Sequence, residues 1–487
     1  MNYTETTESK DGRTIPLIGK NALHSKYNPK REAQSFAAQF KKGGFFVVLG
    51  IAGGYHISAL LQAHPQSKVV AVEAEKADIE FLKRIPEVEK LGNDKRVRFA
   101  SEESIESAIT ESYKPALHGD MTICALRSWE NIFKERKEAI VGKIKDALKK
   151  VSADYSVQSH FGKIWQKNIF ENLKSASESN TDIKKTISGI PSKKTAAIIA
   201  AGPTLDKTVE KIRKDRESYF VIATDTAFSA LEERKIEADC VVSVDGQSVS
   251  HAHFMHAIDN DTIFVFDLCA NSSAARKVVE AGGKAIFTES GHPLARYAST
   301  YTGRRAFPVI ETGSGTVTIA AADFAIKAGF THLEFFGADF SYVDGLPYAK
   351  GTYLDRIYRS DETMLDNFET RFDKLMFRTE LKKTGKRKFT TEILESYSES
   401  MESFLKTRGF KRIENGETKI FTAGKSAKAD WNFSDFDYRK FVEFYRSKMK
   451  NMPEENSPEM MTILPLAAHM KSPILAHAKS LEYTEKL

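Results

Sequence analysis

The sequence predicts an α/β protein built from two Rossmann-like doubly wound units, one N-terminal and one central. Short runs of β-branched and other apolar residues recur along the chain and alternate with helical patterns, which is typical of parallel sheets covered by helices on both faces. The first strand of each series is followed by a glycine-containing turn and a helical pattern. A chain of 487 residues is also too long for one ordinary core and indicates two or three domains.

The N-terminal unit begins after a polar stretch, 1–40, that we expect to be a loosely packed lead-in. A buried strand, a turn and a helix are predicted from GGFFVVLGIAGGYH, and a second strand is predicted at 68–75. The turn Gly50–Gly54 is similar to a dinucleotide or S-adenosylmethionine loop, and Glu73 lies where a ribose-binding carboxylate is expected. Its match to G-x-G-x-x-G is imperfect, so a unit that keeps this shape and binds nothing fits equally well.

The central unit follows a Ser- and Lys-rich segment at 174–194. Its predicted strands are 195–202, 220–225, 240–245, 262–267, 284–289 and 332–339. In such sheets the ligand binds at the carboxyl ends of the strands.

Three further segments complete the expected organisation. Residues 355–400 are charged and helix-prone and predict a helical insertion, with an exposed basic loop at 382–388. A strand at 415–421 is expected to return to the sheet edge. The expected domains are 1–185, 190–425 with the insertion, and a C-terminal helical tail at 426–487.

Composition excludes several classes of protein. The net charge of +6 is the small difference between 72 basic and 66 acidic residues, which does not favour a nucleic-acid partner. The three cysteines are far apart and form neither a metal-binding spacing nor a disulfide framework. No signal-peptide pattern or transmembrane stretch is found, so we expect a cytoplasmic protein.

The loop Gly202-Pro203-Thr204 is the sharpest local signal. Glycine lets a ligand approach the backbone, proline fits the first turn of a helix, and the N–H groups of a helix start can hold a phosphate. An ordinary strand-to-helix turn explains the same residues equally well.

A second candidate anion site is the segment Thr312-Gly313-Ser314-Gly315-Thr316, directly before a helix. It has no P-loop lysine, so it is not a Walker A motif. A capped helix start is the alternative, with Ser314 or Thr316 as the cap.

Acidic residues follow several strands and would meet at one rim of the sheet. They are Asp225, Asp245, Asp267 and Asp339. Such carboxylates suit ribose, sugar hydroxyls or a divalent metal, with helix capping as the alternative and the preferred one for Asp267. Asp245 is the better candidate for binding because Gly246 and Gln247 add bare backbone and an amide.

Tyrosines and histidines are the remaining candidates. Tyr342, Tyr348 and Tyr353 lie after the last strand, where their hydroxyls would stabilise a departing phosphate without metal, or simply form a partly buried aromatic loop. His292 is a candidate catalytic base. His251, His253 and His256 are close in sequence but have no Cys or acidic partner pattern of a metal site, and fit surface or helix positions better.

These segments together resemble a known family. IIAAGPTLD, VIATDTAF, ADCVVSVDGQ and ETGSGTVTIAAADFAIKAGFTHLEFFGADFSY resemble the central domain of the motility accessory factor (Maf) flagellin glycosyltransferases. VVLGIAGGYH and VVAVEAE resemble the N-terminal domain of the same family. The resemblance covers roughly 45–425.

The resemblance implies a central domain similar to bacterial sialyltransferases. It implies transfer of a nonulosonic acid, of the pseudaminic or legionaminic type, from a CMP-activated donor to Ser or Thr of flagellin before export. The flagellin chaperone is a further candidate partner. No tightly bound cofactor and no metal site is implied, and the need for a divalent ion is left open. By analogy the donor site comprises the 202–204 and 312–316 segments together with Asp225, Thr226, Asp245, Gly246, Gln247, Asp339, Tyr342 and Tyr353, with Asp245, Tyr348 and His292 as catalytic candidates.

One departure from the family matters for the chemistry. Members often carry a His shortly after the Asp-Gly that follows the last strand, whereas Asp344-Gly345 here leads to Leu346-Pro347-Tyr348. The base is therefore unassigned. Two alternatives stay open: an ATP-dependent diphosphokinase of the 6-hydroxymethylpterin type, and a non-catalytic flagellin-binding factor.

Overall fold

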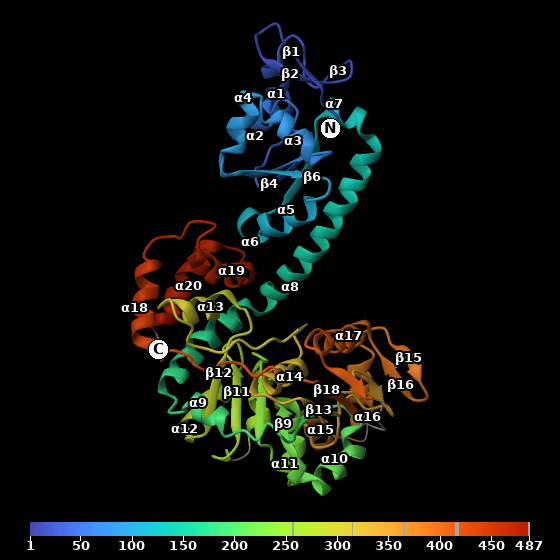
Figure 1. Ribbon diagram of the computed structural model, residues 1–487, viewed down its shortest axis with the longest axis vertical. Coiled ribbons are helices and arrows are strands. Elements are labelled where there is room, and N and C mark those ends of the chain that lie inside the picture. Colours follow the sequence, from blue (N-terminus) through green and yellow to red (C-terminus); the bar gives the residue numbers. More distant parts are fainter. Residues whose placement is uncertain (256–257, 314, 364–365, 414–417, 486–487) are drawn as a thin grey trace. The chain divides into compact units, whose positions relative to one another are not determined.

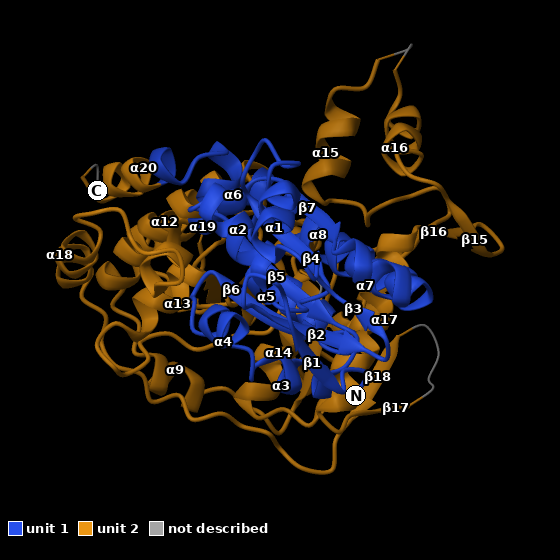
Figure 2. Cartoon of the chain, turned by 90° about the horizontal axis from the view of Figure 1, so that it is seen from above, with its two compact units in different colours: residues 1–162, 464–476 blue, residues 163–463, 477–487 orange. Residues whose placement is uncertain are grey.

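The computed structural model describes residues 1–255, 258–313, 315–363, 366–413 and 418–485. They form two units, coloured separately in Figure 2: 1–162 with 464–476, and 163–463 with 477–487. The 45-residue helix α8 (Lys134–Glu178) begins in the first unit and ends in the second. The expected domain boundaries at 185–190 and 425–426 stay a prediction.

Unit 1 contains a four-stranded parallel sheet in the order β6-β5-β4-β7, which is the arrangement expected of a Rossmann-like unit (Figure 1). Its strands are β4 (Phe45–Leu49), β5 (Lys68–Glu73), β6 (Val97–Ser101) and β7 (Met121–Ala125). Its helices before α8 are α1 (Pro29–Ala37), α2 (Tyr55–Ala63), α3 (Lys76–Leu82), α4 (Pro86–Gly92), α5 (Ile105–Ser112), α6 (Pro115–His118) and α7 (Arg127–Ile132). All five residues of β4 are buried, as the continuous apolar run predicts for a strand covered on both faces.

The expectation of a loose lead-in at 1–40 is wrong. This stretch forms α1 and a small antiparallel sheet of β1 (Glu5–Glu8), β2 (Thr14–Ile18) and β3 (Asn21–Ala22). Tyr3 is fully buried, and its hydroxyl donates to Glu73 at 2.8 Å. The contact between Tyr3 and Glu73 could not be predicted from the sequence, because Tyr3 is a single aromatic residue in a polar stretch and its partner is 70 positions away.

Unit 2 is built around an eight-stranded sheet in the order β12-β11-β10-β9-β8-β13-β18-β17 (Figure 1). The six strands from β12 to β13 are parallel, and β18 and β17 are antiparallel to their neighbours. They are β8 (Thr195–Ile199), β9 (Tyr219–Thr224), β10 (Cys240–Ser243), β11 (Ile263–Asp267), β12 (Lys284–Thr288), β13 (His332–Phe336), β17 (Lys411–Ile413) and β18 (Lys419–Thr422). The α/β fold class and the predicted return strand near 415–421 are confirmed, with 415–417 lying outside the described residues. The strand is not at the sheet edge as expected, because β17 pairs with its other side.

The order of these strands defines one switch point. From β8 the chain proceeds through β9 to β12 on one side, and β13 then pairs with the other side of β8. Ligands of open α/β sheets bind at the carboxyl ends of the strands where the order reverses, here β8 and β13.

Helices connect and cover the strands of this sheet. They are α9 (Ile183–Ser188), α10 (Leu205–Lys214), α11 (Asp225–Glu233), α12 (Ser272–Glu280), α13 (Pro293–Thr300) and α14 (Val317–Ala328), with the 3-10 helices η1 (Arg216–Ser218) and η2 (Ser248–Phe254). Helix α14 packs into the core together with residues of β8, β9 and β13, and ten of its twelve residues are buried.

The segment after β13 differs in part from the expected helical insertion. It contains β14 (Tyr342–Val343), α15 (Tyr353–Ser360), α16 (Phe368–Met376), β15 (Lys382–Gly385), β16 (Lys388–Thr390) and α17 (Glu392–Thr407). The exposed loop predicted at 382–388 is a β-hairpin that pairs with β14. Its run of lysines hid the strand pattern, since charged strands at a sheet edge carry little hydrophobic alternation. The tail contains α18 (Tyr438–Lys448), α19 (Pro458–Met470) and α20 (Pro473–Glu485), so its predicted helices are confirmed.

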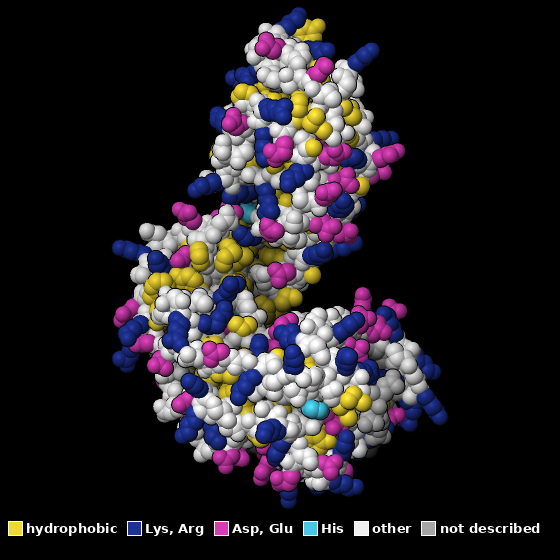
Figure 3. Space-filling view, in the orientation of Figure 1, with side chains coloured by type: hydrophobic (Ala, Val, Ile, Leu, Met, Phe, Trp, Pro, Cys, Tyr) yellow, Lys and Arg dark blue, Asp and Glu magenta, His cyan; other side chains and the backbone are white. Residues whose placement is uncertain are grey.

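The surface shows the balanced charge that composition indicates. Basic and acidic side chains are interspersed on the face of each unit that Figure 3 draws. None of the described helices combines the length and the apolarity needed to cross a bilayer.

The packing of α8 against α19 within unit 1 generates the first prediction. A Cβ at Gly162 would overlap the backbone carbonyl of Pro465, whereas a Cβ at Gly142 of the same helix meets no atom within 4 Å. We expect Gly162→Ala to lower the free energy of unfolding by about 2 kcal/mol or more through overpacking. Gly142→Ala is the control and should raise it by about 0.5–1 kcal/mol. Urea titration followed by circular dichroism compares the two, and equal effects would contradict the contact.

Candidate functional site

A pocket of about 290 Å³ lies at the switch point of the unit 2 sheet. Its walls come from the ends of β8, β9 and β13, the loop after β14, and the first turns of α14 and α17. The pocket brings together six of the predicted site residues: Gly202, Thr226, Thr316, Asp339, Tyr342 and Tyr348. Sequence reasoning missed other lining residues, which include Thr224, Thr318, Phe340, Ser341, Leu394 and Tyr397.

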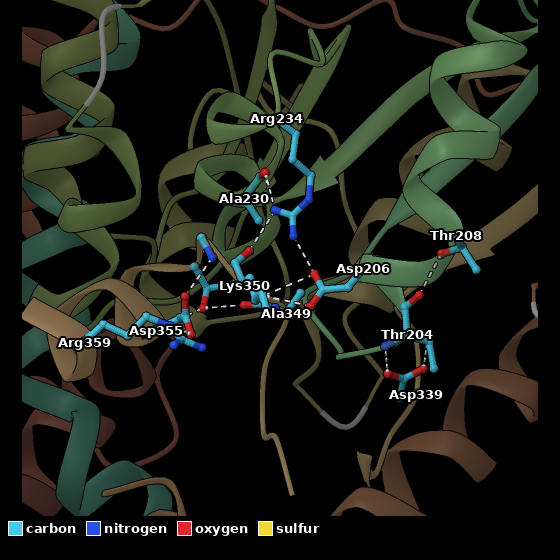
Figure 4. Close-up of polar contacts among 12 residues, drawn as sticks. Thr204, Asp206, Thr208, Ala230, Arg234, Asp339, Ala349, Lys350, Asp355 and Arg359 are labelled. Carbon is cyan, nitrogen blue, oxygen red and sulfur yellow. Dashed lines mark hydrogen bonds and ion pairs between the residues drawn. The ribbon is translucent and has the colours of Figure 1, made fainter. Parts of the chain in front are cut away.

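Asp339 joins the two strands that flank the switch point. Its carboxylate accepts the backbone N–H of Thr204 at 2.9 Å, and it also accepts the Thr204 hydroxyl (Figure 4). Gly202 makes this approach possible: its N–H donates to the Gly337 carbonyl at 2.8 Å, and a Cβ at 202 would overlap both that carbonyl and the Asp339 carboxylate. The glycine of the loop is therefore required by close packing of protein on protein.

The start of α10 has internal partners for the groups that were expected to hold phosphate. The Thr204 N–H is bound by Asp339, and the next three N–H groups bond back to the carbonyls of Gly202, Pro203 and Thr204. Pro203 is buried and does not line the pocket. A carboxylate at a helix N-terminus is also stabilised by the helix dipole, so Asp339 takes the position of an external anion. The binding role of 202–204 stays a prediction.

A second network fixes the loop that carries Tyr348. Arg234, the C-cap of α11, pairs with Asp206 of α10 at 2.5 Å and donates to the carbonyl of Lys350 at 2.8 Å (Figure 4). The N–H of Ala349 donates to the carbonyl of Ala201 at 2.8 Å. The loop after β14 is thereby bound to the elements that follow β8 and β9, and Tyr348 is held at the pocket wall.

The predicted segment 312–316 forms a turn at the start of α14. The N–H groups of Gly315 and Thr316 donate to the carbonyl of Thr312, and the Thr316 hydroxyl caps α14 by accepting the N–H of Thr318 at 3.3 Å. Ser314 lies outside the described residues. Thr316 lines the pocket, so the first turn of α14 faces the site, whereas Thr312, Gly313 and Gly315 do not line it.

The acids after β9 and β10 gather beside the pocket with a histidine. The Asp225 carboxylate accepts the Ser243 hydroxyl at 2.8 Å and the Thr226 N–H at 2.7 Å. Burial raises the pKa of Asp225, while the nearby His253 and these hydrogen bonds favour its charged form. His253 on η2 is buried, and burial lowers its pKa although Asp225 and Asp245 act in the opposite direction.

Asp245, Gly246 and Gln247 form a turn at the start of η2. The Asp245 carboxylate accepts the Gln247 N–H at 2.9 Å. The Gly246 carbonyl accepts the side-chain amide of Asn168 on α8 at 3.0 Å, and the Gln247 carbonyl accepts that of Asn271 at 2.9 Å. The backbone carbonyls of Gly246 and Gln247 are therefore bound by other residues of the protein. Of these three residues, Asp245 is the one whose charge raises the pKa of His253.

His292 has a local structural role. Its Nδ1 accepts the N–H of Leu294 and so caps α13, and its ring packs edge-on against Trp165 with centroids 5.7 Å apart. Burial lowers its pKa to about 3. It does not line the pocket, and its catalytic role stays a prediction.

The tyrosines differ in position. Burial raises the pKa of Tyr342 and of Tyr348, so both pocket hydroxyls remain protonated donors at neutral pH. Tyr353 is the first residue of α15 and packs its ring against His253 instead of lining the pocket.

Lys419 is a charged neighbour that sequence reasoning did not find. It lies on β18 opposite Phe335, donates to the Ala338 carbonyl at 2.9 Å and sits over the Phe340 ring at 5.2 Å. Ala338 and Phe340 line the pocket, so this ammonium group lies directly behind its wall. Burial lowers the pKa of Lys419. In the sequence, the only indication of the position of Lys419 was the strand pattern of the segment 419–422 in which it lies.

The glycine loop of unit 1 is occupied by the unit's own side chains. Glu73 is fully buried and accepts the N–H of Ile51 at 2.8 Å, the Tyr3 hydroxyl and the Trp129 indole N–H at 2.9 Å. A Cβ at Gly50 would lie 2.6 Å from the Trp129 ring. The carboxylate expected to bind a ribose binds the loop itself.

A larger hollow of about 590 Å³ lies at the opposite edge of the unit 2 sheet. It is lined by the amino ends of β9, β11 and β12 and by residues of 178–190. Because α/β sheets bind ligands at the carboxyl ends of their strands, the switch-point pocket is the better candidate site.

The fold and the pocket thus define a two-unit α/β protein with a ligand pocket at the switch point of a doubly wound sheet. The family described as 6-hydroxymethylpterin diphosphokinase MptE-like matches residues 167–345. An uncharacterized protein of Treponema pallidum (strain Nichols) is 31% identical over 223 residues, which cover 45% of this chain and 71% of the relative. A second one from the same organism is 34% identical over 149 residues, 31% of this chain and 69% of the relative.

By this match and by its relation to the first of these Treponema pallidum proteins, the chain belongs to the MptE-like family. The solved structure of the MAf glycosyltransferase from Magnetospirillum magneticum AMB-1 aligns with all of this chain and 87% of its own, at 12% identity and a TM-score of 0.47. A likeness of that degree carries no conclusion about activity.

The contact between Thr204 and Asp339 generates the second prediction. Thr204→Val removes the hydroxyl that donates to the Asp339 carboxylate. Because a hydrogen bond to a charged group is lost, we expect the free energy of unfolding to fall by about 1.5–3 kcal/mol. Thr208→Val is the matched control, since the Thr208 hydroxyl bonds only to the Thr204 carbonyl of its own helix at 3.0 Å. Thermal unfolding compares the variants, and an equal loss would contradict the special weight of the Asp339 contact.

Asp267 generates a prediction on pH. It ends β11 without capping α12, whose cap is Asn271. Burial raises its pKa from 3.8 to about 6, although hydrogen bonds to Cys269 and Ser290 favour ionisation. The folded state therefore binds this proton more tightly than the unfolded state, and the resulting stability is present below pH 3.8 and lost as the pH rises to about 6.

We expect Asp267→Asn to abolish this loss. Relative to the parent protein, the variant should gain of the order of 2–3 kcal/mol in free energy of unfolding between pH 4 and pH 7. The exposed Asp430, changed to Asn, is the control and should show no such slope. Urea titrations across this pH range measure the difference, and parallel curves for Asp267→Asn and the parent would disprove the shift.

Proposed function

We propose that the protein is a glycosyltransferase that transfers a nonulosonic acid of the pseudaminic or legionaminic type from a CMP-activated donor to Ser or Thr of flagellin, in support of flagellar assembly and motility. The observation that carries the proposal is the position and lining of the switch-point pocket. Hydroxyl groups of Thr226, Thr316, Ser341, Tyr342 and Tyr348 surround it, and the first turn of α14 contributes to its wall. Hydroxyl donors suit the ribose, phosphate and sugar hydroxyls of a nucleotide sugar.

The same lining supports departure of the nucleotide. When the bond between sugar and phosphate breaks, negative charge grows on the phosphate oxygen. Tyr342 and Tyr348 are protonated donors, and the helix dipole at the start of α14 favours an anion there. The Lys419 ammonium behind Ala338 and Phe340 adds positive potential to this side of the pocket.

The charge of the β15–β16 hairpin supports a binding surface for the acceptor protein. The hairpin of β15 and β16 carries five basic residues within 382–388 and is connected to the pocket through β14, which pairs with β16. Thr390, the last residue of β16, donates its hydroxyl to the Phe340 carbonyl at 3.0 Å, which connects the hairpin to the pocket wall. We place flagellin on this basic surface, presented with its chaperone in the cytoplasm before export.

A second function is favoured by the family description of residues 167–345 as 6-hydroxymethylpterin diphosphokinase MptE-like. Such an enzyme transfers a diphosphate from ATP with Mg²⁺, which the acids after β9 and β10 would hold. Asp225 and Asp245 would be the ligands.

Thermal-shift titration separates the two functions. CMP should raise the melting temperature of the protein in the presence of EDTA, whereas ATP with Mg²⁺ should have little effect. Stabilisation by ATP–Mg²⁺ and none by CMP would replace the glycosyltransferase with the diphosphokinase.

A transfer assay tests the chemistry. The protein is incubated with purified flagellin and CMP-pseudaminic or CMP-legionaminic acid, and the intact mass of flagellin is measured. We expect addition of the sugar mass, and we expect Tyr348→Phe to lower kcat about 100-fold because it removes one donor to the leaving phosphate. Tyr358→Phe on α15, outside the pocket lining, is the control. Unmodified flagellin with both donors, while the protein is folded, refutes the proposal.

A further inference from the structure

The proposed function leaves the base of the nucleotide without a binding surface. Its hydroxyl groups serve the ribose, the phosphate and the sugar, whereas a nucleotide base presents two flat faces that bind by stacking. The pocket lining contains three side chains that the proposed function has not used. They are Phe340, Leu394 and Tyr397, which we call the apolar wall. Two of the three are aromatic, and aromatic side chains are the usual surfaces on which bases stack.

The apolar wall comes from two segments that are hydrogen-bonded to each other. Leu394 and Tyr397 are three residues apart on α17 and therefore lie on the same face of this helix. The Phe340 carbonyl, in the loop after β13, accepts the Thr390 hydroxyl at 3.0 Å. Thr391, the next residue, caps α17 by accepting the N–H of Leu394 at 3.2 Å. Phe340 is thus connected directly to the start of the helix that supplies the other two side chains.

Phe340 has a backbone conformation that is rare for a large side chain. Its φ is 47°, in the left-handed region where a residue with a Cβ is strained. Such strain persists only where the surrounding contacts enforce it, and it concentrates at active sites and ligand clamps. The conformation of Phe340 therefore points to a function for the position of its ring.

The contacts that enforce this conformation lie on both sides of the residue. Before it, the Ala338 carbonyl and the Asp339 carboxylate are bound by β18 and by the start of α10. After it, the Ser341 hydroxyl donates to the Asp339 carbonyl at 3.0 Å. The carbonyl of Phe340 itself is bound by Thr390. The backbone of the loop is therefore fixed by side chains from three separate elements, and the ring is presented from a rigid support.

The ring of Phe340 stands between a charge and the ligand space. The Lys419 ammonium lies over this ring at 5.2 Å from its centroid, while Phe340 also lines the pocket. This cation–π contact holds the orientation of the ring. The other aromatic residues of the described lining, Tyr342, Tyr348 and Tyr397, carry hydroxyl groups. Phe340 has no hydrogen-bonding group in its side chain, so it offers a ligand only an apolar ring.

We propose that Phe340 is the surface on which the base of the donor nucleotide stacks, with Leu394 and Tyr397 bounding the base at its side, which rests on the proposed function. The ribose and the phosphate extend from the apolar wall toward the hydroxyls of Thr226 and Thr316. Stacking requires a flat ring and not particular hydrogen-bonding groups. The apolar wall therefore favours a nucleotide over a sugar phosphate and contributes little to the choice between bases.

The experiment measures binding of two probes to the full-length protein by isothermal titration calorimetry. The probes are CMP and ribose 5-phosphate, which shares the ribose and the phosphate but has no base. Phe340→Leu should weaken CMP binding about 10-fold or more, because the stacking contact is lost, and should change ribose 5-phosphate binding less than about twofold. Phe340→Tyr keeps a ring and should restore CMP affinity to within about threefold of the parent value.

Phe377→Leu is the matched control. Phe377 is 69% exposed and does not line the pocket, so its loss should leave both affinities unchanged. In the transfer assay, Phe340→Leu should raise KM for the CMP-sugar with little change in kcat, since stacking on the base is equally strong before and during the reaction.

Each outcome decides a separate point. A Phe340→Leu variant that binds CMP as the parent does overturns the base subsite, while sugar transfer by the parent upholds the proposed function. Equal losses for CMP and ribose 5-phosphate indicate a structural role of Phe340 and overturn the subsite as well. A selective loss of CMP binding, in a protein whose parent transfers no sugar to flagellin, supports the subsite and refutes the transfer. A parent protein that binds neither probe overturns both.

Discussion

The carboxylate of Asp339 is the contact on which the geometry of unit 2 depends. It connects the loop after β13 to the start of α10, which follows β8. These are the two neighbouring strands at which the strand order of the sheet reverses. The crossing is so close that only glycine fits at position 202. Because Asp206 and Arg234 then fix the following loop to the same helix, the wall that presents Tyr348 is set by the same group of contacts. Binding groups held in this way need little ordering when a ligand arrives, which favours affinity.

The polar groups around the pocket divide into two sides. Hydroxyls, the start of α14 and the ammonium of Lys419 lie where negative charge would be stabilised, whereas the carboxylates of Asp225 and Asp245 follow β9 and β10 and do not line the pocket. Groups with opposite electrostatic tasks are commonly kept apart in this way so that neither neutralises the other.

The sequence predicted the sheets well because buried parallel strands are continuous apolar runs, and β8 to β13 all carry that pattern. It also placed Asp225, Asp245 and Asp339 at the correct edge, since strand ends share an edge whatever the strand order. It could not show that Asp339 occupies the start of α10, because the partners are 135 residues apart. For the same reason Lys419 was missed: it lies on β18, far in sequence from the loop after β13 whose Ala338 carbonyl it binds, and it has no motif of its own.

Glu73 gives unit 1 a property that a cofactor-dependent domain lacks. In a Rossmann unit with a soluble ligand, the stability of the loop follows the concentration of that ligand. Here the anion is a side chain of the unit itself and lies next to the loop it binds, so its presence does not depend on the concentration of a free ligand. The anion-binding groups of the loop are therefore always occupied by the Glu73 carboxylate. The conformation of this loop is therefore set by the unit's own side chains and does not depend on a bound nucleotide.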